Sequence, residues 1–523
     1  MRILVAGSGS ALGRALVEAL SRGHDVRTLD LAVDGAGSAP TYVGDPRDRD
    51  LATRAVAGCD AIVHLAPLVA PDASALEVLD AATRGTYNLI TSASASRFIL
   101  ASSLRMFERY RAEWRVTEQW APRPTTEVHD LSPYLAELTV REVARVMPLK
   151  AIALRLGEVV DDDAVKRRPA DPRWLHVEDA VQAVERALVF EPDAAGPQTG
   201  WWVFHIVGGG QQTRFPLALA GQPPFGYAPR HDLAGDTKLP RSAASPREPK
   251  RFTNQVGGAA RRVVILGAGG PLAAVTAEAL ARDHVLRLAD VRPLADIAAE
   301  GKPQSPGAPL PRLLGPPHEA RVVDVADPRQ VLDAARGMEA IVNCSVVRPH
   351  PVEAFRVNAL GAYNVMRAAV ECGIRRVVHT GPQQVSFAGP AGYWYDFGVS
   401  PDVPPRPGAS LYILTKFLGQ EICRIFAEEH DLEVPALLFS SFVNQANPPP
   451  EPLGAFAFSV SWEDAAEAVR AALHAPSFPR PFEAFHIVAD LPHGKYPNDK
   501  AKDLLGWQPR DRLEGHWLRD LDG

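Results

Sequence analysis

Cysteine and methionine are scarce in this chain, which has four cysteines and five methionines among its 523 residues. None of the cysteines (Cys59, Cys344, Cys372 and Cys423) has a second cysteine or a histidine at metal-ligand spacing. This argues against a zinc ribbon and against a disulfide framework, and it favours buried thiols in a reducing compartment. We therefore expect a cytoplasmic protein without a metal ion.

The chain also lacks a surplus of basic residues and a long apolar run. Its net charge of -6 provides no basic face for phosphate backbones or anionic lipid. No run of about 18 apolar residues, the length of a membrane-spanning helix, is present. The N-terminal segment passes from a short apolar run directly into a glycine loop, without the apolar region of a signal peptide. Neither nucleic-acid nor membrane partners are expected.

An internal repeat is the main organising feature of the sequence. Residues 1–30 reappear as residues 262–290, each with an apolar run, a glycine loop, an alanine-rich amphipathic segment and a second apolar run that closes on aspartate. Further segments match in the same order: 59–67 with 338–346, 84–90 with 360–366, 176–188 with 461–473, and 203–207 with 484–488. Chance similarity does not preserve such an order, so the chain consists of two related halves.

Strand and helix patterns alternate through both halves, which predicts the α/β class. Each half should form a Rossmann-type, doubly wound parallel sheet with a small C-terminal subdomain on the substrate side. Pro, Ser and charged residues between the halves predict a linker. We place the first domain at 1–235, the linker at 236–260 and the second domain at 261–523.

Each half begins with a glycine loop between its first strand and first helix. Such a loop lets backbone N–H groups approach a pyrophosphate, and the helix N-terminus adds positive potential. The candidate residues are Gly7, Gly9 and Gly13 in the first half and Gly267, Gly269 and Gly270 in the second. In the second half Ala273 stands where the first has Gly13, and its methyl group either is tolerated there or narrows the cleft between helix and strand.

An aspartate follows each loop at the end of the next predicted strand. Asp30 and Asp290 both lie 23 positions after the first loop glycine, which is the spacing that places a carboxylate on the ribose hydroxyls. Because a carboxylate repels a 2'-phosphate, NAD is favoured over NADP. Arg292, close to Asp290, makes this preference weaker in the second half.

These residues resemble the extended short-chain dehydrogenases/reductases, the nucleotide-sugar epimerase and dehydratase group, over nearly the whole chain and twice. The matching motifs are GSGSALG at 7–13, GDPRD at 44–48, AIVHLAP at 61–67, GTYNL at 85–89, HVEDA at 176–180, and Tyr412-x-x-x-Lys416. The resemblance implies hydride transfer to or from nicotinamide. In that chemistry a Tyr moves the proton, a Ser or Thr binds the substrate oxygen, and a Lys one helical turn beyond the Tyr favours its phenolate.

Against this pattern the first half keeps the serine and the tyrosine but lacks the lysine. Ser103 matches the family serine and Tyr134 the family tyrosine, whereas Leu138 occupies the lysine position. Ser103 is also explained as an ordinary hydroxyl at a strand end, and Tyr134 as a packed helical tyrosine.

The second half shows the reverse pattern. Tyr412 and Lys416 are both in place, but Pro382 stands at the serine position. Thr380 precedes it by two residues and replaces the serine only if the strand end shifts.

Four further aspartates match between the halves. The resemblance implies that Asp45 and Asp324 meet the adenine ring, with loop capping as the alternative. Asp179 and Asp464 are expected to cap the helices that follow them.

Two function classes remain open. The first is an NAD-dependent oxidoreductase or epimerase for a sugar-like or other hydroxylated small molecule, with catalysis in at most one half. The second is a catalytically degenerate tandem protein that serves as a dinucleotide-binding scaffold or sensor. Family members commonly pair through the tyrosine-bearing helices, so one hypothesis is that the two halves form an internal pseudo-dimer, and ordinary core packing of these helix faces is the alternative.

Overall fold

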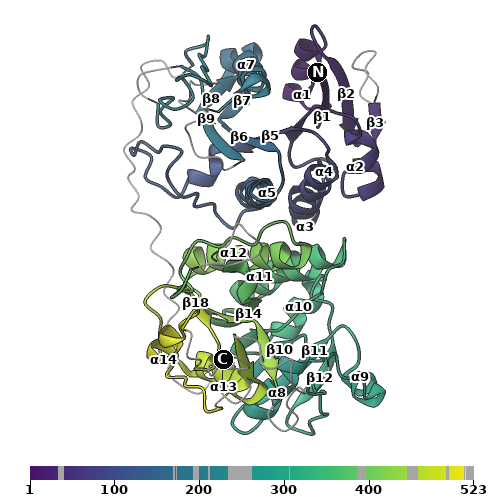
Figure 1. Ribbon diagram of the computed structural model, residues 1–523, viewed down its shortest axis with the longest axis vertical. Helices are drawn as coiled ribbons and strands as arrows, with labels where there is room; N and C mark the ends of the chain where they lie inside the picture. Colours follow the sequence, from purple (N-terminus) through teal and green to yellow (C-terminus); the bar gives the residue numbers. More distant parts are fainter. Residues whose placement is uncertain are drawn as a thin grey trace, which may run out of the picture. The chain divides into compact units, whose positions relative to one another are not determined.

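The computed structural model divides into two compact units, Met1–Glu248 and Pro249–Gly523. It describes residues 1–32, 41–168, 171, 173–192, 200–209, 213–233, 262–305, 307–386, 393, 396–444, 458–490, 494–511 and 513. The predicted linker at 236–260 lies outside these residues, so its character stays a prediction. Figure 1 labels the helices and strands of both units.

The described part of the first unit contains a seven-stranded parallel sheet in the order β3-β2-β1-β4-β5-β6-β9. Its strands are β1 (Arg2–Ala6), β2 (Asp25–Asp30), β3 (Thr41–Val43), β4 (Ala61–Leu65), β5 (Arg97–Ser103), β6 (Lys150–Leu156) and β9 (Trp201–Ile206). A separate parallel pair consists of β7 (Glu158–Val160) and β8 (Trp174–His176).

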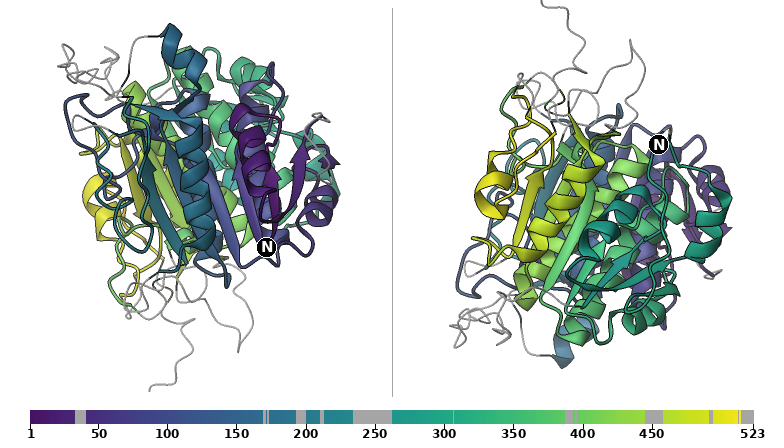
Figure 2. Two further views of the ribbon diagram at one scale, coloured as in Figure 1. Left: turned by 90° about the horizontal axis from the view of Figure 1, so that it is seen from above. Right: turned by 90° about the horizontal axis from the view of Figure 1, so that it is seen from below.

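Helices cover both faces of this sheet. They are α1 (Ala11–Leu20), α2 (Arg49–Val56), α3 (Ala75–Asp80), α4 (Thr86–Ser92), α5 (Val128–Ala144), α6 (Asp162–Arg167) and α7 (Val177–Val189), with a π-helical turn η1 (Ala81–Gly85) and a 3-10 turn η2 (Leu104–Phe107). Helices α1 and α7 pack side by side on one face (Figure 2, left), and their apolar side chains share a core with the strands. Helices α4 and α5 contact each other in the opposite layer.

The second unit repeats this arrangement, with the sheet order β12-β11-β10-β13-β14-β15-β18. Its strands are β10 (Arg262–Leu266), β11 (Val285–Asp290), β12 (Glu319–Val322), β13 (Ala340–Asn343), β14 (Arg376–Pro382), β15 (Val434–Phe439) and β18 (Phe482–His486), beside the pair β16 (Ser441–Val443) and β17 (Ser459–Ser461). Its helices are α8 (Pro271–Leu280), α9 (Leu294–Glu300), α10 (Pro328–Ala335), α11 (Gly361–Cys372), α12 (Leu411–His430), α13 (Trp462–His474) and α14 (Asp499–Leu505), with turns η3 (Ala354–Leu360, π-helical) and η4 (Gln383–Ser386, 3-10). Helices α8 and α13 lie together on one sheet face (Figure 2, right).

The central strands are apolar on both faces because two helix layers bury them. Strand β1 buries Ile3–Ala6, and β10 buries Val263–Leu266 in the same way. Helix α1 begins after Ser10, whose hydroxyl accepts a hydrogen bond from the Gly13 N–H, and an apolar stripe including Leu16 faces the sheet.

The two parallel sheets with helices on both faces confirm the predicted fold class. Cys59, Cys344 and Cys423 are buried free thiols, as expected, and Cys372 is half-buried. Among the described helices, none combines the length and apolar character that crossing a membrane requires.

Candidate functional site

The first glycine loop lies where the strand order reverses, between β1 and β4. Ligands of doubly wound sheets bind at this place, outside the carboxyl ends of the strands. Gly7 has a φ of +96°, and a Cβ there would lie 2.9 Å from the Cβ of Leu65. A Cβ at Gly13 would lie 2.2 Å from the carbonyl oxygen of Gly7. Both positions therefore require glycine, and the loop fits a closely approaching pyrophosphate.

The second unit repeats the loop with one change. Gly267 has a φ of +76°, and a Cβ there would lie 2.8 Å from the backbone nitrogen of Ser345. Ala273, at the position of Gly13, has a fully buried side chain. The methyl group is accommodated between helix and sheet, so this loop also fits a dinucleotide.

The aspartates that end β2 and β11 each bind the glycine loop of their own unit. Asp30 Oδ2 accepts a hydrogen bond of 2.6 Å from the Gly9 N–H, and Asp290 Oδ2 accepts one of 2.8 Å from the Gly269 N–H. Both carboxylates thus lie at the loop, where ribose binding would need them. In the second unit the Arg292 guanidinium is paired with Glu300 and not with Asp290.

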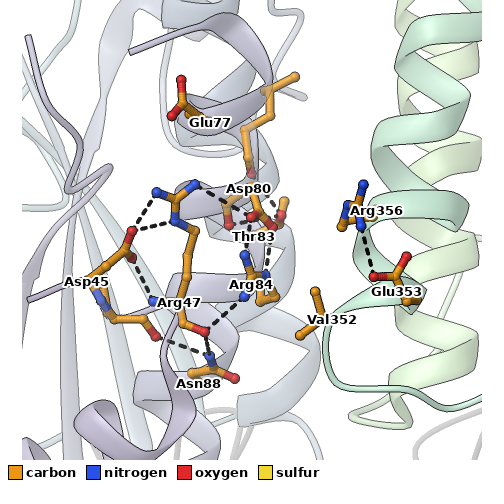
Figure 3. A network of polar contacts seen from close by, with 12 residues as sticks. Asp45, Arg47, Glu77, Asp80, Thr83, Arg84, Asn88, Val352, Glu353 and Arg356 are labelled. Carbon is orange, nitrogen blue, oxygen red and sulfur yellow. Dashed lines mark hydrogen bonds and ion pairs between the residues drawn. The ribbon is translucent and has the colours of Figure 1, made fainter. Parts of the chain in front are cut away.

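Asp45 follows β3 and belongs to a chain of ion pairs within the first unit (Figure 3). Its two oxygens accept hydrogen bonds from the backbone N–H of Arg47, at 2.8 Å, and from the Nε of Arg47, at 2.6 Å. Arg47 Nη1 lies 3.6 Å from Asp80 Oδ2, and Arg84 Nε donates to Asp80 Oδ1 at 2.9 Å. Arg84 and Asn88 both donate to the carbonyl oxygen of Arg47, at 2.9 and 3.0 Å. This network fixes the loop that carries Asp45.

Asp324, like Asp45, accepts a hydrogen bond from the backbone N–H two residues later, but its arginine partner lies farther away than Arg47 lies from Asp45. Its Oδ1 accepts a hydrogen bond of 2.8 Å from the N–H of Ala326, which stands at the position of Arg47. Among the described residues, Arg356 pairs with Asp324, with its Nη2 3.9 Å from Asp324 Oδ2. Side-chain exposure is 35% for Asp324 and 28% for Asp45, so more of the second carboxylate is open to an adenine. Both aspartates act as loop caps, and the adenine contact stays a prediction.

In the first unit the predicted serine and tyrosine come from adjacent elements. Ser103 ends β5, and its Oγ accepts a hydrogen bond of 3.2 Å from the N–H of Arg105. Tyr134 lies on α5, which packs against β5, and its side chain is 7% exposed. Leu138, at the lysine position, is 2% exposed. The family arrangement therefore lacks its ammonium group here.

A buried ionic cluster beside this position was missed by the sequence analysis. Arg155 on β6 donates from Nε and Nη2 to the two oxygens of Glu137 on α5, at 2.9 and 2.8 Å. Ser102 Oγ donates to the same carboxylate at 2.6 Å. Ser102, Glu137 and Arg155 lie on three different elements and are far apart in the sequence, so sequence alone does not reveal this cluster.

At the matching positions of the second unit, all of which the structure describes, this cluster is absent. Strand register places Ser102 opposite Arg155 in the first unit and Gly381 opposite Leu438 in the second. The same helix face that carries Glu137 in the first unit carries Thr415 in the second. The charged Glu137 and Arg155 of the first unit thus correspond to uncharged Thr415 and Leu438 in the second. Lys416 is the buried cation of α12.

Lys416 is buried at the carboxyl end of β13. It is 3% exposed, and its Nζ donates to the carbonyl oxygen of Ser345 at 3.4 Å. Burial lowers its pKa to about 8, so the ammonium form still dominates at neutral pH. The neighbouring thiols of Cys344 and Cys423 are held neutral, because burial raises the pKa of each to about 12.

Tyr412 stands one helical turn before Lys416, but a different cation acts on it. Burial raises the pKa of Tyr412, and the Arg348 guanidinium lowers it. The Arg348 Cζ lies 5.3 Å from the centroid of the Tyr412 ring. The Tyr-x-x-x-Lys spacing predicted this effect for Lys416, whose Nζ instead donates to the carbonyl oxygen of Ser345.

Thr380 does not replace the missing serine. Its Oγ1 donates to the carbonyl oxygen of Asn343 on the neighbouring strand, at 3.0 Å, and Pro382 ends β14. Ser345 offers the better hydroxyl. Its Oγ is buried and has no hydrogen-bond partner among the described residues. Its backbone nitrogen lies close to the first glycine of the loop, 2.8 Å from where a Cβ at Gly267 would stand.

Asn358, in the π-helical turn η3, is a further residue that sequence reasoning missed. Its side chain accepts from the N–H of Val347 and donates to the carbonyl oxygen of Val347, both at 2.9 Å. It also donates to Thr415 Oγ1 at 3.0 Å. Asn358 therefore ties the segment after β13 to the helix that carries Tyr412. π-Helical turns are frequent at functional sites, and only the structure reveals one.

The expectation that Asp179 and Asp464 cap their helices was wrong. The caps are His176 for α7 and Ser461 for α13, and both aspartates lie in the first turn. Asp179 instead accepts hydrogen bonds from the backbone N–H groups of residues 230 and 231, and Asp464 from those of 510 and 511. Each aspartate anchors the segment that follows its sheet, a contact too distant in sequence to be read from helix patterns.

Comparison with known proteins agrees with this geometry. The NAD dependent epimerase/dehydratase family matches the chain twice, over residues 3–169 and 263–456. The chain belongs to this family, and it carries the family's unit in tandem. NAD is the cofactor of the family, and both glycine loops fit it.

Several dehydrogenases are similar to parts of the chain. L-arabinose 1-dehydrogenase (NAD(P)(+)) of Haloferax volcanii is 29% identical over 212 residues, which cover 36% of this chain and 82% of that protein. NAD-dependent glucose-6-phosphate dehydrogenase of the same organism is 24% identical over 261 residues, covering 48% of this chain and 93% of that protein. Among solved structures, uronate dehydrogenase from Agrobacterium tumefaciens is 26% identical with a TM-score of 0.40, over 49% of this chain and 87% of that chain.

Proposed function

We propose that the second unit transfers hydride between NAD and a hydroxyl-bearing carbon of a sugar-like small molecule, and that the first unit binds dinucleotide without turnover. One observation carries the proposal. Lys416 is buried one turn after Tyr412 and reaches the carbonyl of Ser345, whereas Leu138 stands at that place in the first unit.

Each residue has a defined task in this proposal. NAD, when bound, supplies the hydride acceptor. The Tyr412 phenolate accepts the proton of the substrate hydroxyl, and the Arg348 guanidinium beside its ring favours this phenolate against the burial that raises the pKa of Tyr412. Lys416 keeps a positive charge at the cofactor end of the sheet. Ser345 takes the hydrogen-bonding task of the missing serine.

The substrate class rests on the relatives. The similar proteins from Haloferax volcanii are named for L-arabinose and for glucose 6-phosphate. Both compounds carry an anomeric hydroxyl on a ring, which is the kind of group that the proposed chemistry oxidises. We therefore favour an aldose or a close derivative, with NAD rather than NADP because the carboxylates of Asp30 and Asp290, which bind the glycine loops, would repel a 2'-phosphate.

A matched pair of tyrosine variants tests the proposal. The purified chain is screened with NAD and a panel of aldoses and uronic acids, and NADH is followed by absorbance. Tyr412→Phe should lower kcat by about 100-fold or more, because it removes proton transfer. Tyr134→Phe should leave kcat within about twofold, since a group outside the reaction contributes nothing to it. A rate that depends on Tyr134 and not on Tyr412 would contradict the assignment.

The alternative, a dinucleotide-binding scaffold or sensor, is favoured by one feature of the first unit. Arg155 and Glu137 fill the helix-strand contact near the lysine position with a buried ion pair. Titration with NAD on Gly7→Trp and Gly267→Trp variants tells the two functions apart. Binding that is lost in both variants, with no turnover of any substrate, would support the sensor. Absence of NAD binding by the unmodified chain at millimolar concentration would exclude the enzyme.

The duplication supports a proposal about assembly as well. Family members commonly pair through the helix that carries the tyrosine, and this chain has two such helices, so the pairing needs no second chain. The mass in solution tests this proposal, with 56.5 kDa expected for a single chain. A dimer that dissociates after polar substitutions on α5 or α12 would contradict it.

A further inference from the structure

Two histidines that the proposed reaction does not use meet at the edge of the first unit. His176 ends β8 and precedes α7, and His231 lies in the segment that follows the sheet. Their rings stack with centroids 3.8 Å apart and an angle of 29° between the planes. Glu178, in the first turn of α7, faces the same place. Single ligand atoms of His176, Glu178 and His231 all lie within 4.8 Å of one another.

The distances from the two Nε2 atoms to their nearest carboxylate oxygens exceed those of hydrogen bonds. His176 Nε2 lies 3.4 Å from Asp162 Oδ1, and His231 Nε2 lies 3.8 Å from Glu178 Oε2. An N–H···O hydrogen bond spans about 2.7–3.2 Å. Two ligand atoms bound tetrahedrally to Zn²⁺ at about 2.0–2.1 Å are separated by about 3.3 Å. The two pairs therefore lie close to the separation that a shared metal ion imposes.

The state of the two rings provides independent support. The side chain of His176 is 4% exposed, and its Nε2 is buried without a hydrogen-bond partner in the described part of the chain. His231 Nδ1 lies 3.1 Å from Asp179 Oδ2, and that carboxylate is fully buried. A histidine whose Nδ1 is held by a carboxylate presents its Nε2 lone pair to a metal, which is the usual arrangement around zinc.

We propose that His176 Nε2, His231 Nε2 and the carboxylates of Glu178 and Asp162 form a structural Zn²⁺ site. Two neutral imidazoles and two carboxylates balance the charge of the ion and fill four coordination positions, as in closed structural sites. Asp162 is 80% exposed and free to turn toward the ion. On binding, the ring proton of His176 moves to Nδ1, which gives up the long 3.3 Å contact with the Glu178 N–H. The ion ties the segment after the sheet to α7 and α6.

The second unit provides an internal control. Ser461, Glu463 and Asp511 stand at the positions of His176, Glu178 and His231. The anchoring aspartate is kept, because Asp464 accepts from residues 510 and 511 as Asp179 does from 230 and 231. Both imidazoles are therefore present at these positions in the first unit alone, and they are not needed to anchor the segment.

The experiment titrates the full-length chain, freed of metal, with Zn²⁺ by calorimetry and with Co²⁺ by visible absorption. One high-affinity site and the intense absorption of tetrahedral Co²⁺ are expected. His176→Ser, which introduces the N-cap of the second unit, and His231→Gln should each weaken Zn²⁺ binding by at least about tenfold. His129→Gln, at an exposed histidine of α5, is the matched control and should bind as the unmodified chain does.

Thermal unfolding provides a second readout. Zn²⁺ should raise the Tm of the first unit in the unmodified chain and in His129→Gln, but not in His176→Ser. The cluster of Asp283, His284 and His474 in the second unit is the competing location. Binding that survives both His176→Ser and His231→Gln but is lost in His474→Gln would overturn the proposal. So would the absence of any Zn²⁺ binding by the unmodified chain.

Discussion

At the scale of single residues, one pair of matched positions separates the units. Leu138 and Lys416 occupy the same place on α5 and α12, and both side chains are buried. An apolar side chain at such a position stabilises the fold, whereas a buried ammonium is costly because it loses its hydration. The second unit therefore keeps a costly group that the first unit lacks, which is what a functional constraint on Lys416 would produce.

Replacing Lys416 by the residue of the first unit should raise stability and remove activity. Burial lowers the pKa of Lys416 from 10.5 to about 8, so the unfolded chain holds this proton more tightly than the folded chain does at neutral pH. At about 1.4 kcal/mol per pKa unit, Lys416→Leu should raise the free energy of unfolding of the second unit by up to about 3.5 kcal/mol at pH 7. Urea denaturation measures this change.

A surface lysine provides the control for this variant. Lys302→Leu, at an exposed position, should leave the urea midpoint nearly unchanged. A loss of stability in Lys416→Leu would mean that the ammonium is better compensated than its contacts with Ser345 and the two thiols indicate.

At the scale of elements, the contact between the first helix and the first strand distinguishes the two glycine loops. A Cβ at Gly13 would lie 2.7 Å from the Cα of Ser8, in addition to its overlap with Gly7, and both are backbone atoms that cannot turn away. The second unit places Ala273 at this position and buries it completely. The first helix therefore approaches its glycine loop more closely in the first unit than in the second, where there is room for the methyl group of Ala273.

Exchanging these two residues should have unequal effects. Gly13→Ala should destabilise the first unit by about 1–3 kcal/mol through overpacking and weaken its NAD site by at least about tenfold. Ala273→Gly should cost the second unit about 0.5–1 kcal/mol of helix stability and leave its NAD affinity nearly unchanged. Calorimetric titration with NAD resolves the two sites, and thermal unfolding measures the stabilities. Equal losses from both substitutions would show that the loops share one geometry.

Elements were easier to predict from the sequence than contacts between them. The paired glycine loops and the aspartates that end β2 and β11 predicted both sheets, because these signals are local and occur twice. The roles of Arg155, Asn358 and Asp179 were not predictable, since each depends on a partner on another element. The predicted effect of Lys416 on Tyr412 missed Arg348 for the same reason, because their contact is set by tertiary packing.

At the scale of the whole molecule, buried histidines occur on strands of both units. His64 on β4 and His205 on β9 belong to the first unit, and His379 on β14 and His486 on β18 belong to the second. Burial lowers the pKa of His64 to about 4 and those of His205 and His486 to about 3, and it holds the pKa of His379 well below its ordinary value. Below a pH of about 6.5 an unfolded chain would protonate these rings, whereas the folded chain keeps them neutral to a lower pH.

Stability should therefore fall as the pH drops below about 6.5, since the unfolded state then binds more protons than the folded state. The stabilising contribution is fully present above that pH. It is lost progressively until the folded-state values of about 4 for His64 and about 3 for His205 and His486 are reached. At pH 5 His64, His205 and His486 should each cost about 2 kcal/mol relative to pH 8, so the first unit loses about 4 kcal/mol from its pair and the second loses about 2 kcal/mol from His486. Urea midpoints at pH 8 and pH 5, followed separately for the two units, measure this loss.

His205→Phe isolates one of these contributions. The His205 ring packs edge-on against Phe107 and Phe215, with centroids 5.3 and 5.5 Å away, so a phenyl ring fits its surroundings. The variant should lose about 2 kcal/mol less than the unmodified chain between pH 8 and pH 5 in the first unit, because the unfolded state gains one proton fewer. His129→Gln, on the surface, should follow the unmodified chain. If His205→Phe and the unmodified chain lose equal stability, His205 is protonated within the fold, and the acid sensitivity of the first unit comes from its carboxylates.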